Sequence, residues 1–340
     1  MTRERALVIG PAWVGDMVIA HSLFQVLKAR TPECALDVVA PAATAPLAQR
    51  MPEIDEAITL PVAHGRLALL PRISLGLHLR ERHYERAYVL PRSWKAALPA
   101  WLSGAKRRTG FLGEARFGLI NDVRSEPRGV KLRTVDRFLR LAEEPGVPKR
   151  EAPVPHLLRD LDHGRRTLSR LGASADGAPI LVLCPGAEYG PAKRWPARHF
   201  ATLARRYHAR GWQVWLLGSA RDRAIADAIR ADAPDRCLDF IGHTTLLEAL
   251  DLLAFARAVV TNDSGLMHVA AALGVPVVAV FGSSDPRHTP PLSARAEVLW
   301  RHLDCSPCFA RTCRFGHLRC LEEITPGHVE EALERLLTAD

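Results

Sequence analysis

Short apolar runs that alternate with amphipathic segments place the strongest constraint on the fold of this chain. The run RALVIG (5–10) is typical of a buried strand, and the segment 17–30 after it repeats its apolar residues at helical spacing. Strands are expected at 5–10, 35–41, 56–61 and 86–91, and helices at 17–30 and 43–52. A basic amphipathic stretch, 66–82, lies between the last two strands. Strands that are apolar along their length and separated by helices predict a parallel sheet covered on both faces.

The alternation fades after about residue 135 and restarts beyond a segment, 143–162, that is rich in proline and charge. Strands are expected again at 178–186, 212–219 and 257–263, and helices at 161–171, 197–211, 221–234, 245–256 and 326–337. The sequence therefore predicts two doubly wound, Rossmann-like α/β domains, 1–160 and 161–325, with a terminal helix at 326–340. If they face one another, they enclose a cleft.

Composition narrows the class of protein without choosing a partner. The 340 residues carry a formal net charge of +9, which favours a nucleic acid, an anionic membrane or a phosphorylated substrate. No segment approaches the roughly 20 apolar residues of a membrane span. The start of the chain shows no cleavable apolar region, so we expect a cytoplasmic protein.

Polar loops follow several predicted strands, at the sheet edge where α/β proteins bind ligands. Asn262, Asp263, Ser264 and Gly265 separate a strand from an alanine-rich helix, and His268 lies about one turn further on. Asn262 or Asp263 can cap this helix, and its free N–H groups suit a phosphate or diphosphate. The alternative is a well-capped helix with His268 packed on its flank.

A second loop, CPGAEYGPAKRWP (184–196), combines glycine and proline with a basic pair. Lys193 or Arg194 would neutralise phosphate charge, and Trp195 would anchor the loop. The loop lacks the pattern of a P-loop. A long loop of this kind adds no core and is therefore typical of function, although a solvated basic loop is the alternative.

The turn GPAWVGDM (10–17) has the spacing G-x4-G, which disfavours nicotinamide-dinucleotide binding. Asp16 in this turn either caps the following helix or acts as a general base. The segment 91–124 mixes basic and aromatic residues, among them Lys95, Arg108 and Arg116. Such a mixture suits a nucleic acid, a phosphorylated and partly apolar acceptor, or a solvated surface.

These motifs, with RTG (108–110) and TPPLS (289–293), resemble those of the lipopolysaccharide heptosyltransferases, in that family's order and over most of the chain. The resemblance implies a GT-B type glycosyltransferase that inverts the anomeric carbon without a catalytic metal or other cofactor. It implies transfer of heptose from ADP-L-glycero-D-manno-heptose, bound by the C-terminal domain, to the first heptose of heptosyl-Kdo2-lipid A, bound by the N-terminal domain. The partners are then these two substrates and the cytoplasmic face of the inner membrane, touched peripherally, and not a nucleic acid.

The resemblance also implies site residues. Asp16 would be the general base. The residues expected at the donor are Lys193, Asp263, Ser264, Gly265, His268, Gly186 and Thr244, and those expected at the acceptor are Lys95, Arg108 and Arg116. The rival interpretations are a heptosyltransferase of type I or III, a nucleotide-sugar epimerase and, more distantly, a basic nucleic-acid-binding protein.

Four cysteines near the C-terminus are not explained by the resemblance. Cys305, Cys308, Cys313 and Cys320 have the spacing C-x2-C-x4-C-x6-C. Clustered thiols in a cytoplasmic protein favour a structural Zn²⁺ site over disulfides. An iron–sulfur cluster or four unliganded thiols are the alternatives.

Overall fold

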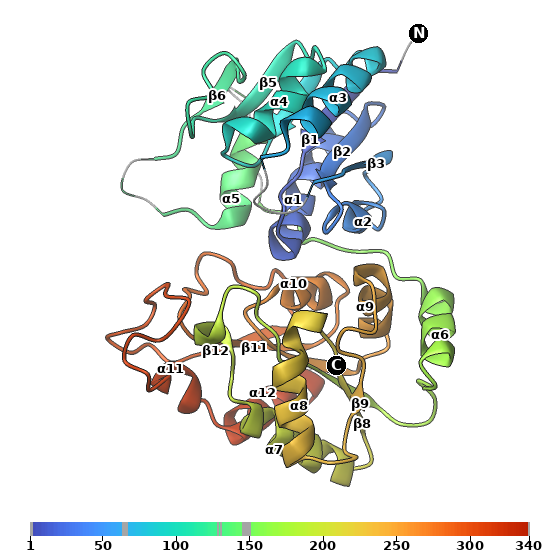
Figure 1. Cartoon of the computed structure of the whole chain (residues 1–340), viewed down its shortest axis with the longest axis vertical. Coiled ribbons are helices and arrows are strands. Elements are labelled where there is room, and N and C mark those ends of the chain that lie inside the picture. The colour runs from blue at the N-terminus through green and yellow to red at the C-terminus, as the bar shows by residue number, and fades with distance from the viewer. Residues whose placement is uncertain (1–2, 63–66, 128, 130, 145–150, 339–340) are drawn as a thin grey trace. The chain divides into compact units, whose positions relative to one another are not determined.

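The computed structural model describes residues 3–62, 67–127, 129, 131–144 and 151–338. It divides into two compact units, Met1–Leu157 and Leu158–Asp340 (Figure 1). None of the helices in the described ranges has the length and apolar character that a bilayer crossing requires.

The first unit is built on a six-stranded sheet in which all paired strands are parallel. In chain order the strands are β1 (Arg5–Ile9), β2 (Ala35–Pro41), β3 (Glu56–Leu60), β4 (Arg86–Val89), β5 (Arg107–Phe111) and β6 (Asp122–Arg124). Across the sheet the order is β3-β2-β1-β4-β5-β6. The central strand β1 is buried over its last four residues, as its continuous apolar sequence predicts.

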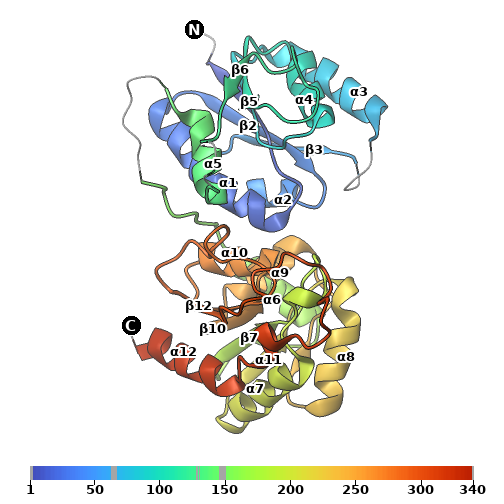
Figure 2. The same cartoon turned by 90° about the vertical axis from the view of Figure 1, so that its left-hand side faces the viewer.

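Helices cover both faces of this sheet. They are α1 (Val14–Arg30), α2 (Ala45–Ala48), α3 (Leu69–Leu79), α4 (Trp94–Leu102) and α5 (Thr134–Leu139). The helices α1 and α5 pack together on one face, while α3 and α4 pack together on the other (Figure 2). The predicted helix 43–52 is wrong in length, because α2 forms only one turn. The segment 91–124, interpreted as a basic surface strip or binding segment, forms α4, β5 and β6.

The second unit repeats the architecture with unrelated sequence. Its strands are β7 (Ile180–Cys184), β8 (Gln213–Leu216), β9 (Leu238–Asp239), β10 (Ala258–Asn262), β11 (Val277–Phe281) and β12 (Ala296–Trp300). Its helices are α6 (Leu161–Arg170), α7 (Ala197–Ala209), α8 (Arg223–Asp232), α9 (Leu246–Leu253), α10 (Gly265–Ala272), α11 (Arg319–Glu322) and α12 (Pro326–Thr338). The helix α12 packs against α7, β11 and β12 and so completes this unit.

Both sheets share one strand order. In the second unit it is β12-β11-β10-β7-β8-β9, so that each unit has the Rossmann order 3-2-1-4-5-6 when its own strands are counted from one. The prediction of two Rossmann-like α/β sheets is thereby confirmed. In such sheets the ligand lies at the carboxyl ends of the strands, at the switch point where the strand order reverses. The switch points of this chain lie between β1 and β4 and between β7 and β10.

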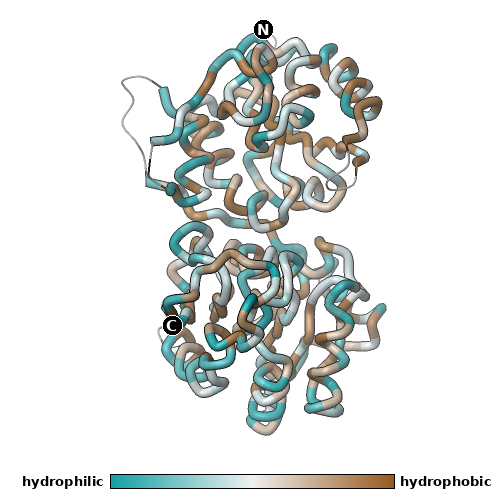
Figure 3. The backbone as a smooth tube through the Cα atoms, turned by 60° about the vertical axis from the view of Figure 1, so that its left-hand side comes forward, coloured by the Kyte–Doolittle hydropathy of each residue, from teal (hydrophilic) through white to brown (hydrophobic). Residues whose placement is uncertain are grey.

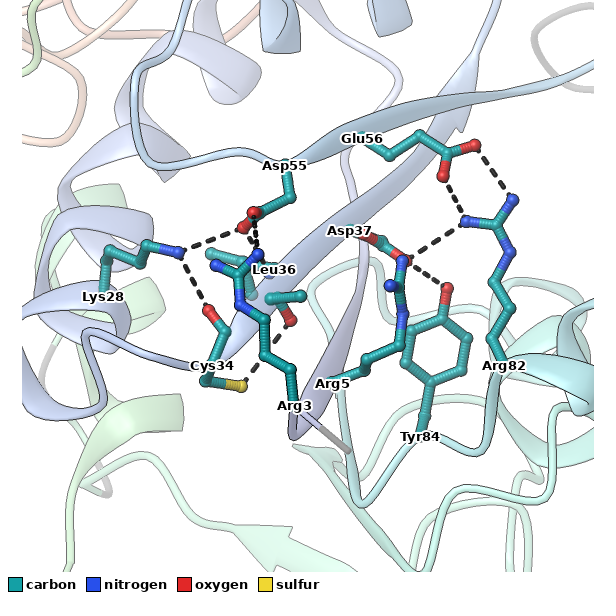
Figure 4. Close-up of polar contacts among 11 residues, drawn as sticks. Arg3, Arg5, Lys28, Cys34, Leu36, Asp37, Asp55, Glu56, Arg82 and Tyr84 are labelled. Carbon is teal, nitrogen blue, oxygen red and sulfur yellow. Dashed lines mark hydrogen bonds and ion pairs between the residues drawn. The ribbon is translucent and has the colours of Figure 1, made fainter. Parts of the chain in front are cut away.

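The opposite, amino edge of the first sheet is held by a polar network (Figure 4). Asp37 is fully buried and accepts hydrogen bonds from Arg5 (2.6 Å), Arg82 (3.3 Å) and Tyr84 (2.6 Å). Arg82 also pairs with Glu56 at the start of β3. Burial and the bond to Asp37 raise the pKa of Tyr84 far above its usual value. The network ties β1, β2, β3 and the entry to β4 together at the edge away from the switch point.

Candidate functional site

Two loops meet at the switch point of the second unit. The strands β7 and β10 pair in parallel, with Cys184 opposite Thr261, so the loop after Cys184 and the loop after Asn262 leave the sheet side by side. The first loop ends in a 3-10 turn, Pro191–Lys193, before α7, and the second leads into α10. Register alone therefore brings the two predicted loops together.

Asn262 fastens the two loops to each other. Its side-chain carbonyl accepts a hydrogen bond from the Trp195 N–H (2.9 Å), and its amide donates to the Pro185 carbonyl (2.7 Å). Trp195 is fully buried and donates its indole N–H to the Ile324 carbonyl (2.7 Å). The prediction that Trp195 anchors the loop is confirmed. Asn262 therefore holds the loop 184–196 against the end of β10 and does not cap α10.

Asp263 holds the Lys193 ammonium. The Lys193 Nζ lies 2.5 Å from the Asp263 carboxylate, whose side chain is 7% exposed, and the Ser284 hydroxyl donates to the same carboxylate oxygen. The ammonium also lies 4.9 Å from the centre of the Tyr189 ring. Three neighbours thus fix the position of one cation. The expectation that Asp263 caps α10 is wrong, because its carboxylate is occupied by Lys193 and Ser284.

The helix α10 begins without a side-chain cap. Ser264 occupies the N-cap position and its side chain makes no cap hydrogen bond. The first N–H groups of a helix lack intrahelical partners, and the helix dipole adds partial positive charge. An anion that approaches Gly265 meets these N–H groups with no intervening Cβ. Uncapped N–H groups beside a fixed lysine have the chemistry that a phosphate requires.

His268 lies one turn along α10 and is buried. Burial lowers its pKa to about 4, a shift that Asp263 opposes and Lys193 reinforces. The imidazole is therefore neutral near pH 7, and it can donate one N–H to a phosphate or sugar oxygen without adding charge.

Packing against Asp222 requires a glycine at position 186. A Cβ at this position would lie 2.4 Å from the Asp222 carboxylate. That carboxylate is held in turn by the Ser219 N–H (3.0 Å) and hydroxyl (2.8 Å). Thr244 has a buried hydroxyl oxygen that has no hydrogen-bond partner among the described residues. An unsatisfied buried hydroxyl is consistent with a ligand contact.

Sequence reasoning missed two residues of this site. Ser284 donates to Asp263, and Tyr189 lies beneath the Lys193 ammonium. Ser284 stands three residues beyond Phe281, where β11 ends. Since β11 neighbours β10, the rule that the carboxyl ends of parallel strands form the site could have included it. Tyr189 carries no comparable signal.

Asp16 stands at the switch point of the first unit. It lies in the first turn of α1, directly after β1, and its side chain is partly exposed. The strand β1 pairs with β2 on one side and with β4 on the other, so the strand order reverses beside Asp16. The first unit therefore presents a carboxylate at the position where an open α/β sheet binds its ligand.

The three acceptor candidates have different surroundings. Lys95 is partly exposed in the first turn of α4. Arg108 donates to the carbonyls of Leu119 (2.9 Å) and Ala105 (2.7 Å). Arg116 is fully buried, with its guanidinium on the carbonyls of residues 91 and 111, and burial lowers its pKa to about 10. The two arginines therefore shape the loop between β5 and β6, while Lys95 lies in the first turn of α4.

The four C-terminal cysteines are neighbours, and all are free thiols. Within the described residues, one group of three or more potential metal ligands has donor atoms within 4.8 Å of one another, and it is His21, Glu53 and His156. There the His156 N–H donates to His21 Nδ1 (3.1 Å) and His21 Nε2 lies 2.5 Å from Glu53. Both ring nitrogens of His21 are thus engaged in hydrogen bonds within the protein. The cysteine sulfurs are not gathered to that degree.

Two Rossmann-ordered units define the class of this protein. One unit carries a carboxylate and the other an uncapped helix start beside a fixed lysine, each at its switch point. These features are those of a GT-B glycosyltransferase, an enzyme that transfers a sugar from a nucleotide donor.

The comparisons with known proteins identify the family. The model of glycosyltransferase family 9 (heptosyltransferase) matches residues 72–319. Lipopolysaccharide heptosyltransferase 2 of Escherichia coli K12 is 43% identical, with 98% of each chain covered. The solved E. coli ADP-heptose LPS heptosyltransferase II has a TM-score of 0.86 at 41% identity, covering 98% of this chain and 99% of that one. E. coli heptosyltransferase WaaC with ADP shares the fold, with a TM-score of 0.73 at 19% identity over 98% and 99% of the two chains. The chain belongs to glycosyltransferase family 9 and is a heptosyltransferase.

Proposed function

We propose that this enzyme transfers heptose from ADP-heptose to the first heptose of the lipopolysaccharide inner core, on heptosyl-Kdo2-lipid A. The observation that carries the proposal is the Lys193 ammonium, held by Asp263 beside the uncapped start of α10. The names of relatives that align over nearly the whole chain support the donor and the pathway. This activity is performed at the cytoplasmic face of the inner membrane.

The donor diphosphate binds at the start of α10. The N–H groups at Ser264 and Gly265 and the Lys193 ammonium receive the negative charge that grows on the leaving ADP. The neutral His268 donates a hydrogen bond to the diphosphate or the adjoining sugar, and the Thr244 hydroxyl gains a partner in the bound donor. Fixed positive groups of this kind replace a divalent cation, so transfer needs no metal and no cofactor.

The transfer is a single displacement with inversion. The acceptor hydroxyl oxygen forms a bond to the anomeric carbon while the bond from that carbon to the diphosphate oxygen breaks. The hydroxyl proton passes to the Asp16 carboxylate, and ADP leaves with both electrons of the broken bond. Lys95 binds anionic groups of the acceptor core, while Arg108 and Arg116 act through the loop that they shape.

The test combines purified protein with ADP-heptose and mono-heptosylated Kdo2-lipid A and follows product mass and ADP release. Asp16→Asn should lower kcat by about 10²- to 10⁴-fold and leave ADP affinity near the wild-type value. Asp162→Asn, a change at an exposed carboxylate of α6, is the matched control. Near-normal turnover of Asp16→Asn would remove the general base from the proposal, and a rate abolished by EDTA would contradict metal-free transfer. Release of ADP without the lipid acceptor would favour an enzyme that acts on free nucleotide sugar.

The four cysteines are proposed to hold a structural Zn²⁺ apart from the chemistry. Backbone N–H groups of Leu318 and Phe315 hydrogen-bond the Cys313 sulfur and lower its pKa, which favours a thiolate. Cys305 and Cys308 lie near enough to Cys320 to act with its burial in raising the pKa of that thiol to about 11. Binding of Zn²⁺ would draw the four sulfurs into a tetrahedron.

Such a metal would also steady the donor loop. The segment between β12 and α11 has no helix or strand, yet its Arg311 carbonyl accepts from the Ala192 N–H (3.0 Å) and its Phe309 N–H donates to Ser283 (2.7 Å). Elemental analysis of protein purified without a metal-affinity column should find about one equivalent of zinc. Metal removal should lower the melting temperature more than the turnover of folded enzyme. Less than about a tenth of an equivalent of zinc or iron, with freely titratable thiols, would end this part of the proposal.

A further inference from the structure

The segment 301–318, between β12 and α11, packs against the loop that carries Lys193. Polar and apolar residues are mixed along this segment (Figure 3). Its Arg311 carbonyl accepts a hydrogen bond from the Ala192 N–H (3.0 Å). A Cβ at Gly190 would lie 2.5 Å from the same carbonyl oxygen. Residue 311 therefore lies directly against the 3-10 turn Pro191–Lys193.

The Tyr189 ring brings the side chains of Arg311 and Lys193 to one place. Its hydroxyl donates to the Phe309 carbonyl (2.6 Å), which fixes the ring. The Arg311 guanidinium carbon lies 5.0 Å from the centre of this ring, and the Lys193 Nζ lies 4.9 Å from the same centre. Cations at such distances are attracted to an aromatic ring. Two positive groups are therefore held beside one tyrosine.

The other basic side chains around this loop are neutralised by carboxylates. The ion pairs are Lys193 with Asp263 (2.5 Å), Arg194 with Asp222 (3.9 Å), Arg221 with Glu188, and Arg287 with Asp285 (2.7 Å). Each pair has no net charge. His268 adds none near pH 7, because burial lowers its pKa to about 4. These groups together therefore give the start of α10 no net positive charge.

Arg311 is the exception among these cations. Its side chain is exposed, and no carboxylate of the described residues forms an ion pair with it. The diphosphate of a nucleotide sugar carries two negative charges, and departure of the sugar adds a third. A helix N-terminus supplies only about half an elementary charge. The guanidinium of Arg311 is thus the full positive charge beside this loop that a carboxylate does not already compensate.

We propose that Arg311 binds the diphosphate of the nucleotide donor, as a second cation beside Lys193. This inference rests on the proposed function and names a further residue of the same site. A guanidinium donates two parallel N–H bonds to a phosphate, with a geometry that an ammonium lacks. Because Arg311 is exposed, it can turn from the Tyr189 ring to a phosphate without leaving a buried carboxylate unpaired. The cysteine-containing segment then contributes directly to donor binding.

Isothermal titration at low salt tests this assignment. Arg311→Gln removes the charge and should weaken ADP affinity by about tenfold or more. Affinity for adenosine, which has no phosphate, should stay unchanged, and the loss for ADP should shrink at high salt. Arg314→Gln is the matched control, since Arg314 is exposed in the same segment with its guanidinium 4.8 Å from the centre of the Phe315 ring. Its ADP affinity should equal that of the wild type.

The outcomes separate this inference from the proposed function. Wild-type ADP affinity in Arg311→Gln would overturn the assignment and leave the transfer reaction intact. Equal losses for ADP and adenosine would also overturn it, because they would show that residue 311 packs the loop without contacting phosphate. A wild-type enzyme that neither binds ADP nor transfers heptose would instead refute the proposed function. In the transfer assay, kcat/KM for ADP-heptose should fall by about tenfold in Arg311→Gln, with an unchanged KM for the acceptor.

Discussion

Substitution of Lys193 and Asp263 tests whether the carboxylate binds the donor or positions the lysine. The two groups lie 2.5 Å apart, and their side chains are 16% and 7% exposed. A hydrogen bond between charged groups contributes about 1.5–3 kcal/mol. If Lys193 binds the diphosphate as proposed, Lys193→Ala removes one such bond and should weaken ADP affinity by about 10- to 150-fold. Among the described residues it leaves the Asp263 carboxylate with the Ser284 hydroxyl as its side-chain donor, so the free energy of unfolding should fall by about 1–3 kcal/mol.

The double variant gives the decisive measurement. If Asp263 acts through Lys193, Asp263→Asn lowers ADP affinity in the wild-type enzyme and has almost no further effect in the Lys193→Ala background. Isothermal titration with ADP measures affinity, and urea denaturation measures stability. Lys106→Ala is the control, because its ammonium is 75% exposed in its pair with Glu85 and its loss should change stability by less than about 1 kcal/mol. Equal losses of affinity from Asp263→Asn in both backgrounds would show that the carboxylate contacts the donor itself.

Three further changes probe the structure around the site. Burial lowers the pKa of His268 in the folded protein to about 4, from an ordinary 6.5. Its contribution to the free energy of unfolding is therefore complete above pH 6.5 and is lost as the pH falls toward 4, with a slope of at most about 1.4 kcal/mol per pH unit. Denaturation of His268→Asn should lack that slope, and a pH profile identical to the wild type would contradict this prediction. Gly186→Ala should destabilise by about 1–3 kcal/mol and be partly rescued by Asp222→Ala, whereas additive losses would refute the close contact. Asp37→Ala should lower the free energy of unfolding by about 3–5 kcal/mol, because it leaves Arg5 and Arg82 without their buried acceptor. ADP affinity should stay unchanged. A melting temperature equal to that of the wild type would show that the network around Asp37 does not stabilise the sheet.

Much of the fold could be predicted because burial leaves a trace in local sequence. A strand covered on both faces must be apolar along its length, and β7, β10 and β11 are buried at every position. The strands β5, β6, β9 and β12 escaped prediction, and they are partly exposed or short. β5 opens with two arginines, and β12 has no fully buried residue. These strands form through pairing with a neighbour rather than through an apolar run of their own.

The candidate site was visible in the sequence as residue types after strands. Lys193, Ser264, Gly265 and His268 stand in loops or first turns at carboxyl ends, where the fold leaves N–H groups unpaired. Their chemistry follows from position relative to the nearest strand, and that relation is local. The resemblance to a known family extended the interpretation to the donor and the acceptor.

What each polar side chain contacts was decided only by the tertiary structure. Asn262 and Asp263 looked like helix caps, yet their partners Trp195 and Lys193 lie 67 and 70 residues away. Arg116 was predicted at the acceptor, and the fold buries it on the carbonyls of Pro91 and Phe111. The spacing of a loop determines which groups reach the sheet edge. Parallel register and packing then determine which of those groups form hydrogen bonds with one another and which retain an N–H or a charge that a ligand can contact. The reason is that a buried polar group needs a hydrogen-bond partner, and that partner can come from any part of the chain that the fold brings near.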